Sequence, residues 1–189
     1  MIIGENILIR VVEEEDLPEI HKWSNDFELM EFFDFIINFT SFDQLTKKYN
    51  EMESNSDNTN FIIIEKETKK PVGQCQFTEM DFINKKSLCS LYIGDRDSMD
   101  KGYGTEAMKL MMKIGFEDLN LNRLGLWVFD FNKKAIKSYK KCGMKVEGIM
   151  REGVYRDGKY HDIYFMGILK SEYEEIVKGG SIECSEANM

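Results

Sequence analysis

The chain has 189 residues, of which 42% are hydrophobic and 31% charged, a composition typical of one soluble globular domain with a sizeable core. Its net charge of −9 suits a cationic substrate or serves solubility alone, and it disfavours nonspecific binding to nucleic acid or an anionic membrane, which needs clustered positive charge. The sequence has no long apolar run and no basic segment followed by an apolar stretch, so we expect neither a membrane span nor a secretory signal.

The N-terminal part is predicted to combine strands with helices. In chain order we expect a strand at 7–12, a helix after the acidic run 13–16, a helical piece near 27–33, a helix from Ser41 and a polar loop at 52–60. Acidic residues favour a helix N-terminus because they oppose the positive end of the helix dipole. Leu45 and Tyr49 lie four residues apart, on one face of the helix that Ser41 begins.

Three strands are predicted next, at 61–64, 71–78 and 87–93, with a turn at 67–70 between the first two. Their short length and β-branched content indicate an antiparallel meander. Two further strands are predicted near 145–150 and 160–169, around a turn at Asp157-Gly158.

Between these strand groups the pattern changes. A polar loop at 95–101 leads into an amphipathic helix that opens at Gly102, followed by a strand at 124–129 and a helix at 132–142 that Gly143 ends. The fold class is therefore α/β (α+β), with a mixed, mostly antiparallel sheet of about seven strands flanked by helices. We expect one domain over residues 1–178 and a disordered tail over 179–189.

The residue types that bind metals lack the spacing of a metal site. The chain has these cysteines and histidines: Cys75, Cys89, Cys142, Cys184, His21 and His161. No two cysteines form a CxxC pair and the histidines are far apart, so we expect no metal. The cysteines are interpreted as reduced thiols of a cytoplasmic protein.

A glycine-rich turn connects a predicted strand to a predicted helix. It comprises residues 99–107, MDKGYGTEA, in which Gly102 and Gly104 allow the backbone to approach a ligand closely. The first helical turn exposes unpaired N–H groups, which suit a pyrophosphate, and Lys101 adds a positive charge. Such a turn also serves tight strand–helix packing, and no GK[ST] follows, so it is not a Walker loop.

The helix at 132–142 carries a second set of candidates. Asn132 and Tyr139 are seven residues apart, or two helical turns, so both face one way. Ala135 lies between them and leaves room for a ligand. Taken alone, Tyr139 is equally explained as a core aromatic with a solvated hydroxyl.

The order strand, xxGxG, helix, strand, NxxAxxxY resembles the acetyl-CoA core of the GNAT superfamily of N-acetyltransferases. Residues 147–162, EGIMREGVYRDGKYHD, and MGIL at 166–169 resemble the branch with ribosomal-protein N-terminal and spermidine acetyltransferases. The resemblance covers residues 5–173 and implies a GNAT fold, with acetyl-CoA as co-substrate. Two positions depart from the family pattern: Met99 stands where Gln or Arg is frequent, and Met144 replaces the usual Phe.

The resemblance also implies roles for individual residues. A tyrosine at the position of Tyr139 acts as the general acid that protonates the departing thiolate. The strand end at Tyr92 and Ile93 holds the pantetheine arm through backbone bonds, and a backbone N–H there polarises the thioester carbonyl. The full implied cofactor-binding set is Tyr92, Ile93, Met99, Lys101, Gly102, Tyr103, Gly104, Thr105, Asn132, Ala135 and Tyr139.

The general base is left open. The strand at 87–93 contains no carboxylate, and Cys89 stands where some relatives have Glu. Glu79 and Asp81 are candidates, acting through water, and Glu79 is also a candidate for binding the substrate. Glu28 and Glu31, on the acceptor-side helices, could bind a cationic amine. For each of these carboxylates, simple solvation on the surface is an equally valid interpretation.

The sequence therefore favours a cytoplasmic acetyl-CoA-dependent N-acetyltransferase that acts on a primary amine, with a polyamine such as spermidine as the best single candidate. A protein N-terminus is the alternative acceptor. A non-catalytic acyl-CoA-binding module is a second alternative: Tyr139 speaks against it, and the missing strand carboxylate speaks for it. Whether the protein forms a homo-oligomer is left open.

Overall fold

One mixed sheet of eight strands forms the centre of the computed structural model, which describes residues 1–33, 39–53 and 58–180. The strands are β1 (Ile2–Ile3), β2 (Ile7–Val11), β3 (Thr59–Glu65), β4 (Pro71–Asp81), β5 (Lys86–Ile93), β6 (Arg123–Phe129), β7 (Lys145–Arg156) and β8 (Lys159–Leu169). Their order in space is β1-β2-β3-β4-β5-β6-β8-β7, and every neighbouring pair is antiparallel except β5 and β6. The predicted meander and fold class are confirmed, although the sheet has eight strands rather than seven.

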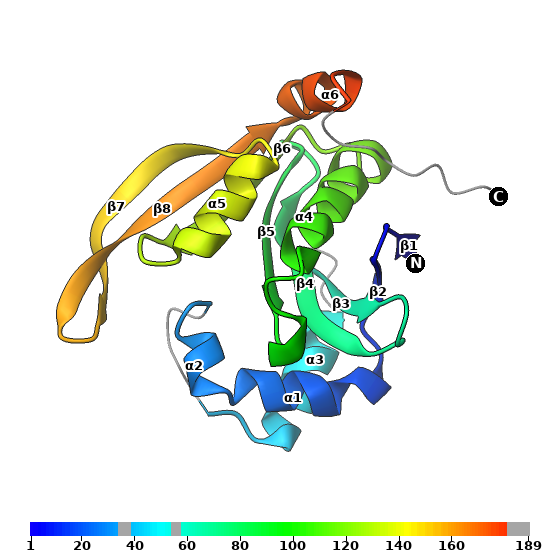
Figure 1. Ribbon diagram of the computed structural model, residues 1–189, viewed down its shortest axis with the longest axis vertical. Coiled ribbons are helices and arrows are strands. Elements are labelled where there is room, and N and C mark those ends of the chain that lie inside the picture. Colours follow the sequence, from blue (N-terminus) through cyan, green and yellow to red (C-terminus); the bar gives the residue numbers. More distant parts are fainter. Residues whose placement is uncertain (34–38, 54–57, 181–189) are drawn as a thin grey trace.

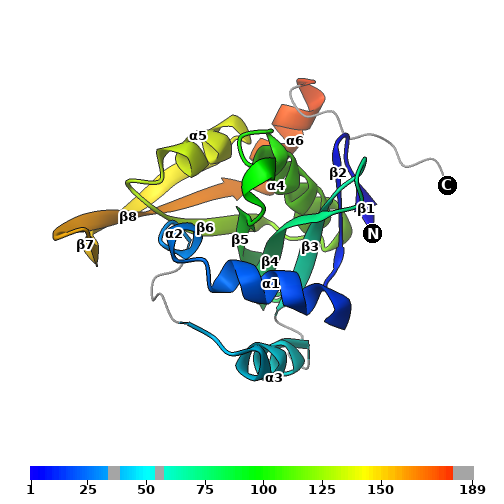
Figure 2. The same cartoon turned by 60° about the horizontal axis from the view of Figure 1, so that its bottom comes forward.

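Helices cover both faces of this sheet, as Figures 1 and 2 show. On one face lie α4 (Tyr103–Lys113) and α5 (Lys133–Lys141), and on the other lie α1 (Leu17–Ser24) and α3 (Phe42–Glu53). The other helical elements are η1 (Glu14–Asp16), α2 (Phe27–Met30), η2 (Arg96–Ser98), the π-helical turn η3 (Ile114–Asp118) and α6 (Lys170–Lys178). Among the described residues, no helix has the length and apolar character needed to cross a membrane.

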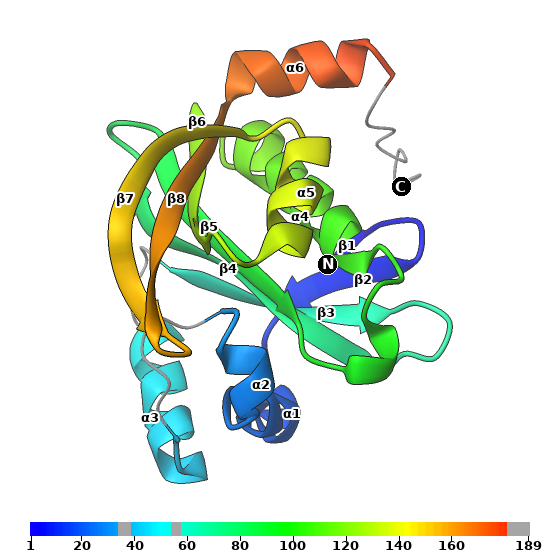
Figure 3. The ribbon, with the colours of Figure 1, turned by 60° about the vertical axis from the view of Figure 1, so that its left-hand side comes forward.

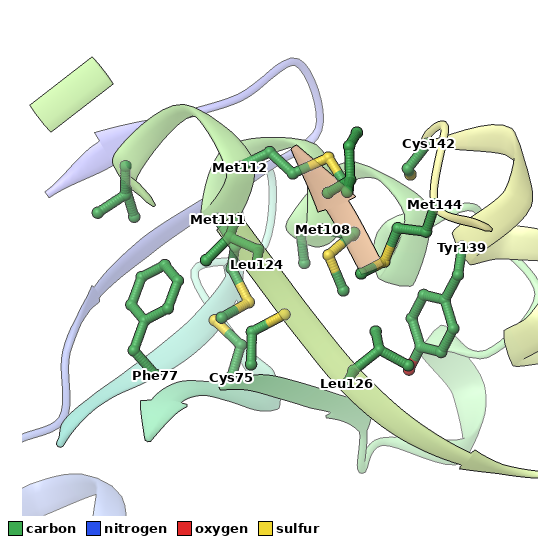
Figure 4. Packing of buried hydrophobic residues seen from close by; sticks show 14 of the residues in the cluster. Cys75, Phe77, Met108, Met111, Met112, Leu124, Leu126, Tyr139, Cys142 and Met144 are labelled. Carbon is green, nitrogen blue, oxygen red and sulfur yellow. The ribbon is translucent and has the colours of Figure 1, made fainter. Parts of the chain in front are cut away.

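The larger apolar core lies between α4 and the sheet (Figure 4). Met108, Met111 and Met112 of α4 are fully buried and pack with Phe77 of β4 and Leu124 of β6. Helical spacing brings these apolar side chains to one side of α4, and the amphipathic character predicted for this helix is confirmed. Methionine is flexible and fills irregular gaps, which suits a core shared between a helix and a twisted sheet.

A second apolar cluster lies on the opposite face, beneath α1 and α3. Trp23 of α1 is buried there, and Leu45 and Tyr49 of α3 pack against the same cluster. The helix start is also as predicted, because the Ser41 hydroxyl accepts the backbone N–H of Gln44 at 3.2 Å. The N-terminal helices therefore cover this face of the sheet.

Two expected boundaries in the N-terminal part are wrong. The polar loop expected at 52–60 is shorter, since α3 continues to Glu53 and β3 begins at Thr59; residues 54–57 lie outside the described residues. The helical piece expected near 27–33 is helical only over Phe27–Met30 and continues as a turn. The two-residue strand β1, which pairs with β2, was not expected.

The C-terminal part has a longer strand than the sequence predicts and one helix that was not predicted. β7 continues to Arg156 because it pairs with β8 along a long, strongly bent hairpin (Figure 3). α6 follows β8 directly: the Glu172 carboxylate accepts the Leu169 N–H at 2.9 Å, and Tyr173 is buried. The expected tail at 179–189 lies outside the described residues from 181 onward.

The two parallel strands at the centre of the sheet separate along their length. β5 and β6 pair only from Lys86 with Arg123 to Leu88 with Gly125. β5 nevertheless continues to Ile93 and β6 to Phe129. Beyond Leu88 the two facing strand edges have no pairing with each other. We call this opening, between residues 89–93 and 126–129, the strand split.

Candidate active site

The glycine turn lies at the start of α4 and is open to a ligand. Gly102 has a φ of 87°, which requires glycine, and a Cβ there would meet nothing within 4 Å. A Cβ at Gly104 would meet only Leu91 and Ile93, at 3.7 and 3.9 Å. Within the described residues, no hydrogen bond uses the N–H groups of Gly102, Tyr103 or Gly104. These donors and the positive end of the helix dipole form an anion site that fits a pyrophosphate.

The side chains of Lys101 and Tyr103 are both engaged with Glu65 of β3. The Tyr103 hydroxyl donates to Glu65 Oε1 at 2.5 Å, and Lys101 Nζ lies 3.5 Å from the same atom. Hydrogen bonds from Thr68 and Tyr103 lower the pKa of Glu65, and the bond to Glu65 raises the pKa of Tyr103 to about 12. The sequence predicted that Lys101 adds positive charge to the anion site, but Glu65 compensates that charge. The side chains of Lys101 and Tyr103 instead connect the glycine turn to β3.

Positive charge near the turn comes from α5, which the sequence analysis did not single out. The helix carries five exposed lysines: Lys133, Lys134, Lys137, Lys140 and Lys141. Lys134 Nζ forms an ion pair of 2.8 Å with Asp100 in the turn. α4 and α5 are in contact, so the lysine-rich helix lies beside the anion site. A count of lysines within 133–141 would have been a usable signal.

Tyr139 of α5 is buried at the level of the strand split. It is only 8% exposed and belongs to the core that contains Leu126 of β6 and Cys89 of β5 (Figure 4). Burial, together with the nearby Cys89 and Cys142 thiols, raises the pKa of its hydroxyl. Among the described residues, no hydrogen bond engages this hydroxyl. The Tyr139 hydroxyl therefore keeps its proton at neutral pH, and no hydrogen bond to another described residue has to break before it can bind a ligand.

Two further predicted cofactor residues have structural partners. Asn132 Oδ1 accepts the Ala135 N–H at 3.2 Å, which caps α5, and its Nδ2 donates to the Phe32 carbonyl at 3.2 Å. Thr105 and Ser138 share a hydrogen bond of 2.7 Å between their hydroxyls, which joins α4 to α5. Asn132 thus links the start of α5 to the turn after α2.

The two predicted residues at the end of β5 point to opposite faces of the sheet. Ile93 packs with the core on the α4 side, close to Gly104. Tyr92 lies on the other face, where its hydroxyl donates to Gln74 at 3.0 Å. Its ring contacts Trp23 and Phe33 edge-to-face, with centroids 6.1 and 4.8 Å apart. Met99, the remaining predicted residue, is 38% exposed at the start of the glycine turn.

The predicted acceptor-side carboxylates are in different states. Glu28 forms an ion pair of 2.8 Å with Arg96, which also binds Asp26. Glu31, at the C-terminal end of α2, is partly buried. Neither Glu31 nor Glu79 forms an ion pair among the described residues. Glu28 is thus already neutralised, while the other two carboxylates are available to a cation.

The two base candidates lie at the far end of β4. Glu79 is exposed at a bulge, with a φ of 52°. Asp81 accepts the backbone N–H of Asn84 at 2.8 Å and its side-chain amide at 2.6 Å, so it is used in the hairpin turn. These hydrogen bonds from Asn84 lower the pKa of Asp81. Of the two, Glu79 alone has an uncommitted carboxylate.

A histidine–aspartate pair that the sequence analysis missed lies where β6 ends. His161 Nδ1 of β8 is 2.9 Å from the Asp130 carboxylate, and both side chains are partly buried. The histidine ring contacts Phe131, which in turn contacts Phe32. The two residues are 31 positions apart, and only the β6–β8 register brings them together. Among the described residues, no cluster of three or more His, Cys, Asp or Glu could hold a metal ion.

The chain is similar in sequence to known acetyltransferases. The family model "Acetyltransferase (GNAT) domain" matches residues 6–145. The spermidine N(1)-acetyltransferase of Escherichia coli K12 is 30% identical over 145 residues, which cover 77% of this chain and 76% of that protein. An uncharacterized N-acetyltransferase, p20 of Bacillus licheniformis, is 29% identical over 172 residues, 89% of this chain and 96% of that protein.

Solved structures have a similar fold. The crystal structure of spermidine N-acetyltransferase from Vibrio cholerae, in complex with CoA and spermine, superposes with a TM-score of 0.84 at 26% identity. The superposition covers 90% of this chain and 99% of the other. Together with the family match over residues 6–145, it shows that this chain belongs to the GNAT family of acetyltransferases.

Proposed function

We propose that this protein transfers the acetyl group of acetyl-CoA to a primary amine of a polyamine, with spermidine as the leading candidate. The observation that carries the proposal is the strand split, which has the open glycine turn beside Ile93 at the end of β5 and the buried Tyr139 packed with the residues at which the strands separate. The relatives named spermidine acetyltransferase, from Escherichia coli and Vibrio cholerae, support the choice of acceptor.

The chain's own groups fit acetyl-CoA, which supplies an activated thioester. The free N–H groups of the glycine turn and the α5 lysines would bind its phosphates. The unpaired edge of β5 at Tyr92 and Ile93 would hold the pantetheine arm by backbone hydrogen bonds. Met99 and Thr105 would line the same path.

Tyr139 is proposed as the proton donor to the departing thiolate. Its raised pKa keeps the proton on the hydroxyl at neutral pH, as a general acid requires. Because the hydroxyl has no hydrogen-bond partner among the described residues, none has to be broken when a thiolate develops beside it. Asn132 and Ala135 would act less directly, by fixing the start of α5.

Carboxylates are proposed to hold the distal ammonium groups of the acceptor. Glu31 and Glu79 have no ion pair among the described residues, whereas Glu28 is occupied by Arg96. The net charge of −9 draws cations to the surface in general. A polyamine carries several ammonium groups, so one can be bound while another reacts in its neutral form.

The test is a coupled assay for CoA release over a panel of acceptors. Spermidine and spermine are compared with short peptides and an aminoglycoside. We expect the highest kcat/KM with a polyamine. A higher kcat/KM with peptides would identify a protein N-terminus as the acceptor, and no release with any amine would favour a non-catalytic acyl-CoA-binding module.

We further propose that the protein forms a homo-oligomer through β6, β7 and β8. Trp127, Ile149 and Met150 are 42%, 55% and 50% exposed and form an apolar strip with Phe165. A spermidine N-acetyltransferase of Vibrio cholerae has been solved in a dodecameric form. Size-exclusion chromatography with light scattering measures the mass of the protein in solution. A mass of 22.1 kDa, that of one chain, would contradict this proposal.

A further inference from the structure

Three polar side chains form a straight row across the centre of the sheet. Strand register places Asn60 of β3 opposite Gln76 of β4, and Gln76 opposite Ser90 of β5. The residues that follow or precede them in sequence pack in the core below α4: Phe61, Cys75 and Cys89. Because strand side chains alternate between faces, the polar row lies on the other face of the sheet, which is the face that carries α1 and α3 (Figure 2).

Only some of the polar atoms in this row form hydrogen bonds with each other. Gln76 Nε2 donates to the Ser90 hydroxyl at 2.9 Å, which holds the two side chains together. Asn60 Oδ1 is buried and accepts no hydrogen bond. Gln76 Oε1 also has no donor among the described residues. An unsatisfied buried acceptor costs stability, so a position that keeps one calls for an explanation outside the fold itself.

The position of the row connects it to the reaction. Ser90 lies two residues beyond Leu88, the last residue of β5 that pairs with β6. The row therefore ends at the strand split and runs from there across β4 to β3. The next row on the same face, Gln74 and Tyr92, borders it with the aromatic wall that Tyr92 forms with Trp23.

The chemistry of the row matches a primary amine in its reactive form. A neutral amine has two N–H donors and one lone pair, and only the lone pair attacks the thioester carbon. Two amide oxygens can accept the two N–H groups and leave the lone pair free. Asn60, Gln76 and Ser90 carry no charge and are partly buried, and partial removal from water lowers the pKa of an amine and so favours its neutral form.

We infer that Asn60, Gln76 and Ser90 bind the reacting amine of the acceptor and orient its lone pair toward the strand split. This inference rests on the proposed function and deepens it. It divides the acceptor site in two: uncharged oxygens hold the nitrogen that is acetylated, and the carboxylates Glu31 and Glu79 hold the charged remainder. These three are positioning residues, which act on the acceptor and leave acetyl-CoA binding alone.

The test compares two variants with a matched control. Gln76→Met keeps the side-chain length without its oxygen, and Asn60→Leu removes the unsatisfied Oδ1. Thr78→Val is the control, because Thr78 lies on the same strand and face, one row farther along β4. For each protein, calorimetry gives the Kd of spermidine in the presence of CoA and the Kd of acetyl-CoA. Steady-state kinetics give KM and kcat, and thermal unfolding gives Tm.

We expect Gln76→Met and Asn60→Leu to raise the Kd and KM for spermidine about fivefold, the loss of about one hydrogen bond. The Kd of acetyl-CoA should not change in either, and Thr78→Val should match the wild type. Asn60→Leu should have an unchanged or higher Tm, because a buried unsatisfied oxygen is removed. A weaker acceptor complex in a more stable protein is a result that a purely structural role for Asn60 does not produce.

Two results would overturn the inference. One is an unchanged spermidine Kd in both variants, which would leave the polar row a structural feature even if the wild type acetylates spermidine. The other is the absence of any amine binding to the wild type. If the wild type binds spermidine but releases no CoA, the proposed function fails and the inference is judged on the Kd values alone.

Discussion

Arg96, in the loop before α4, forms a two-pronged ion pair with Asp26, the residue that caps α2. The guanidinium Nη2 and Nε lie 2.9 and 3.2 Å from Asp26 Oδ2. Asp26 Oδ1 also accepts the Leu29 N–H at 3.2 Å. One carboxylate thus begins the acceptor-side helix and fastens it to the loop that leads into the glycine turn. This contact therefore links the proposed acceptor side of the site to the proposed cofactor side.

Replacing Arg96 with methionine should loosen the acceptor side without unfolding the protein. The pair is largely exposed, and such pairs contribute at most about 1 kcal/mol, so Tm should fall by no more than about 4 °C. We expect KM for the amine to rise severalfold while the Kd of acetyl-CoA changes little. Asp26→Asn should give the same result, and the double variant should be no worse than either single one. Additive effects on KM would contradict the coupling.

The same pair predicts a pH dependence of stability. Burial acts to raise the pKa of Asp26, but the hydrogen bonds from Arg96 and Leu29 outweigh it, and the pKa is lowered from its ordinary value of 3.8. A carboxyl group with a lowered folded-state pKa stabilises the protein above its unfolded pKa, and this contribution is lost as pH falls through the folded value. The difference in unfolding free energy between wild type and Asp26→Asn should therefore be constant above about pH 5 and shrink below 3.8. Denaturant titrations across this range would measure it, and a constant difference down to pH 3 would refute the assignment.

Tyr139→Phe should separate catalysis from packing. The ring stays in the core and only the hydroxyl is lost, so we expect kcat to fall by roughly 10²–10⁴-fold, the usual contribution of a general acid. Tm should not fall, because the hydroxyl makes no hydrogen bond among the described residues. Tyr173→Phe is the matched control, because Tyr173 lies in α6, which carries none of the candidate site residues, and its hydroxyl donates to Glu117 at 2.6 Å. That variant should lose about 1 kcal/mol of stability with kcat unchanged. A wild-type kcat in Tyr139→Phe, with chemistry rate-limiting, would return Tyr139 to a core role.

Gly104→Val tests the anion site. Gly104 has no left-handed φ, and its Cβ position borders only Leu91 and Ile93, so the variant should fold. A branched side chain there would fill the space above the free N–H groups and weaken acetyl-CoA binding by at least about tenfold, or about 1.4 kcal/mol. Gly148→Val is the control, because Gly148 also has open surroundings and lies on β7. Equal acetyl-CoA affinity in both variants, measured by calorimetry, would exclude the glycine turn as the phosphate site.

The parts of the fold that follow local patterns could be predicted from the sequence. The amphipathic helix α4, the Ser41 cap and the order of the meander all depend on residues close together in the chain. The hairpin β7–β8 was underestimated because its outer half has few buried side chains and depends on pairing with its partner strand. α6 was missed because its only buried residue is Tyr173, and a single apolar position gives no periodic signal.

Within the candidate site, the sequence predicted the elements that carry the candidate residues but not the partners of their side chains. Gly102 and Tyr139 lie where the pattern indicated. The ion pairs of Glu65 with Lys101 and of Arg96 with Glu28 depend on contacts between segments that are distant in sequence. The polar row illustrates the limit: Asn60, Gln76 and Ser90 are unremarkable in sequence, and only the register of three strands makes them one surface.

The carboxylates on the acceptor side should contribute unequally to polyamine binding. Glu28 is paired with Arg96 at 2.8 Å, so its charge is already compensated, whereas Glu31 and Glu79 have no ion pair among the described residues. We expect Glu79→Gln and Glu31→Gln each to raise KM for spermidine about two- to fivefold, the range of an exposed ion pair, and Glu28→Gln to have a smaller effect. The increases should diminish at moderate salt, since exposed charges are screened. Kinetics at two salt concentrations, with a monoamine as the control acceptor, would separate the contributions. The monoamine has no distal ammonium, so its KM should be insensitive to all three changes. If Glu28→Gln weakens spermidine more than the other two, the carboxylate that holds the distal ammonium is the one beside Arg96, and the free carboxylates are surface charges.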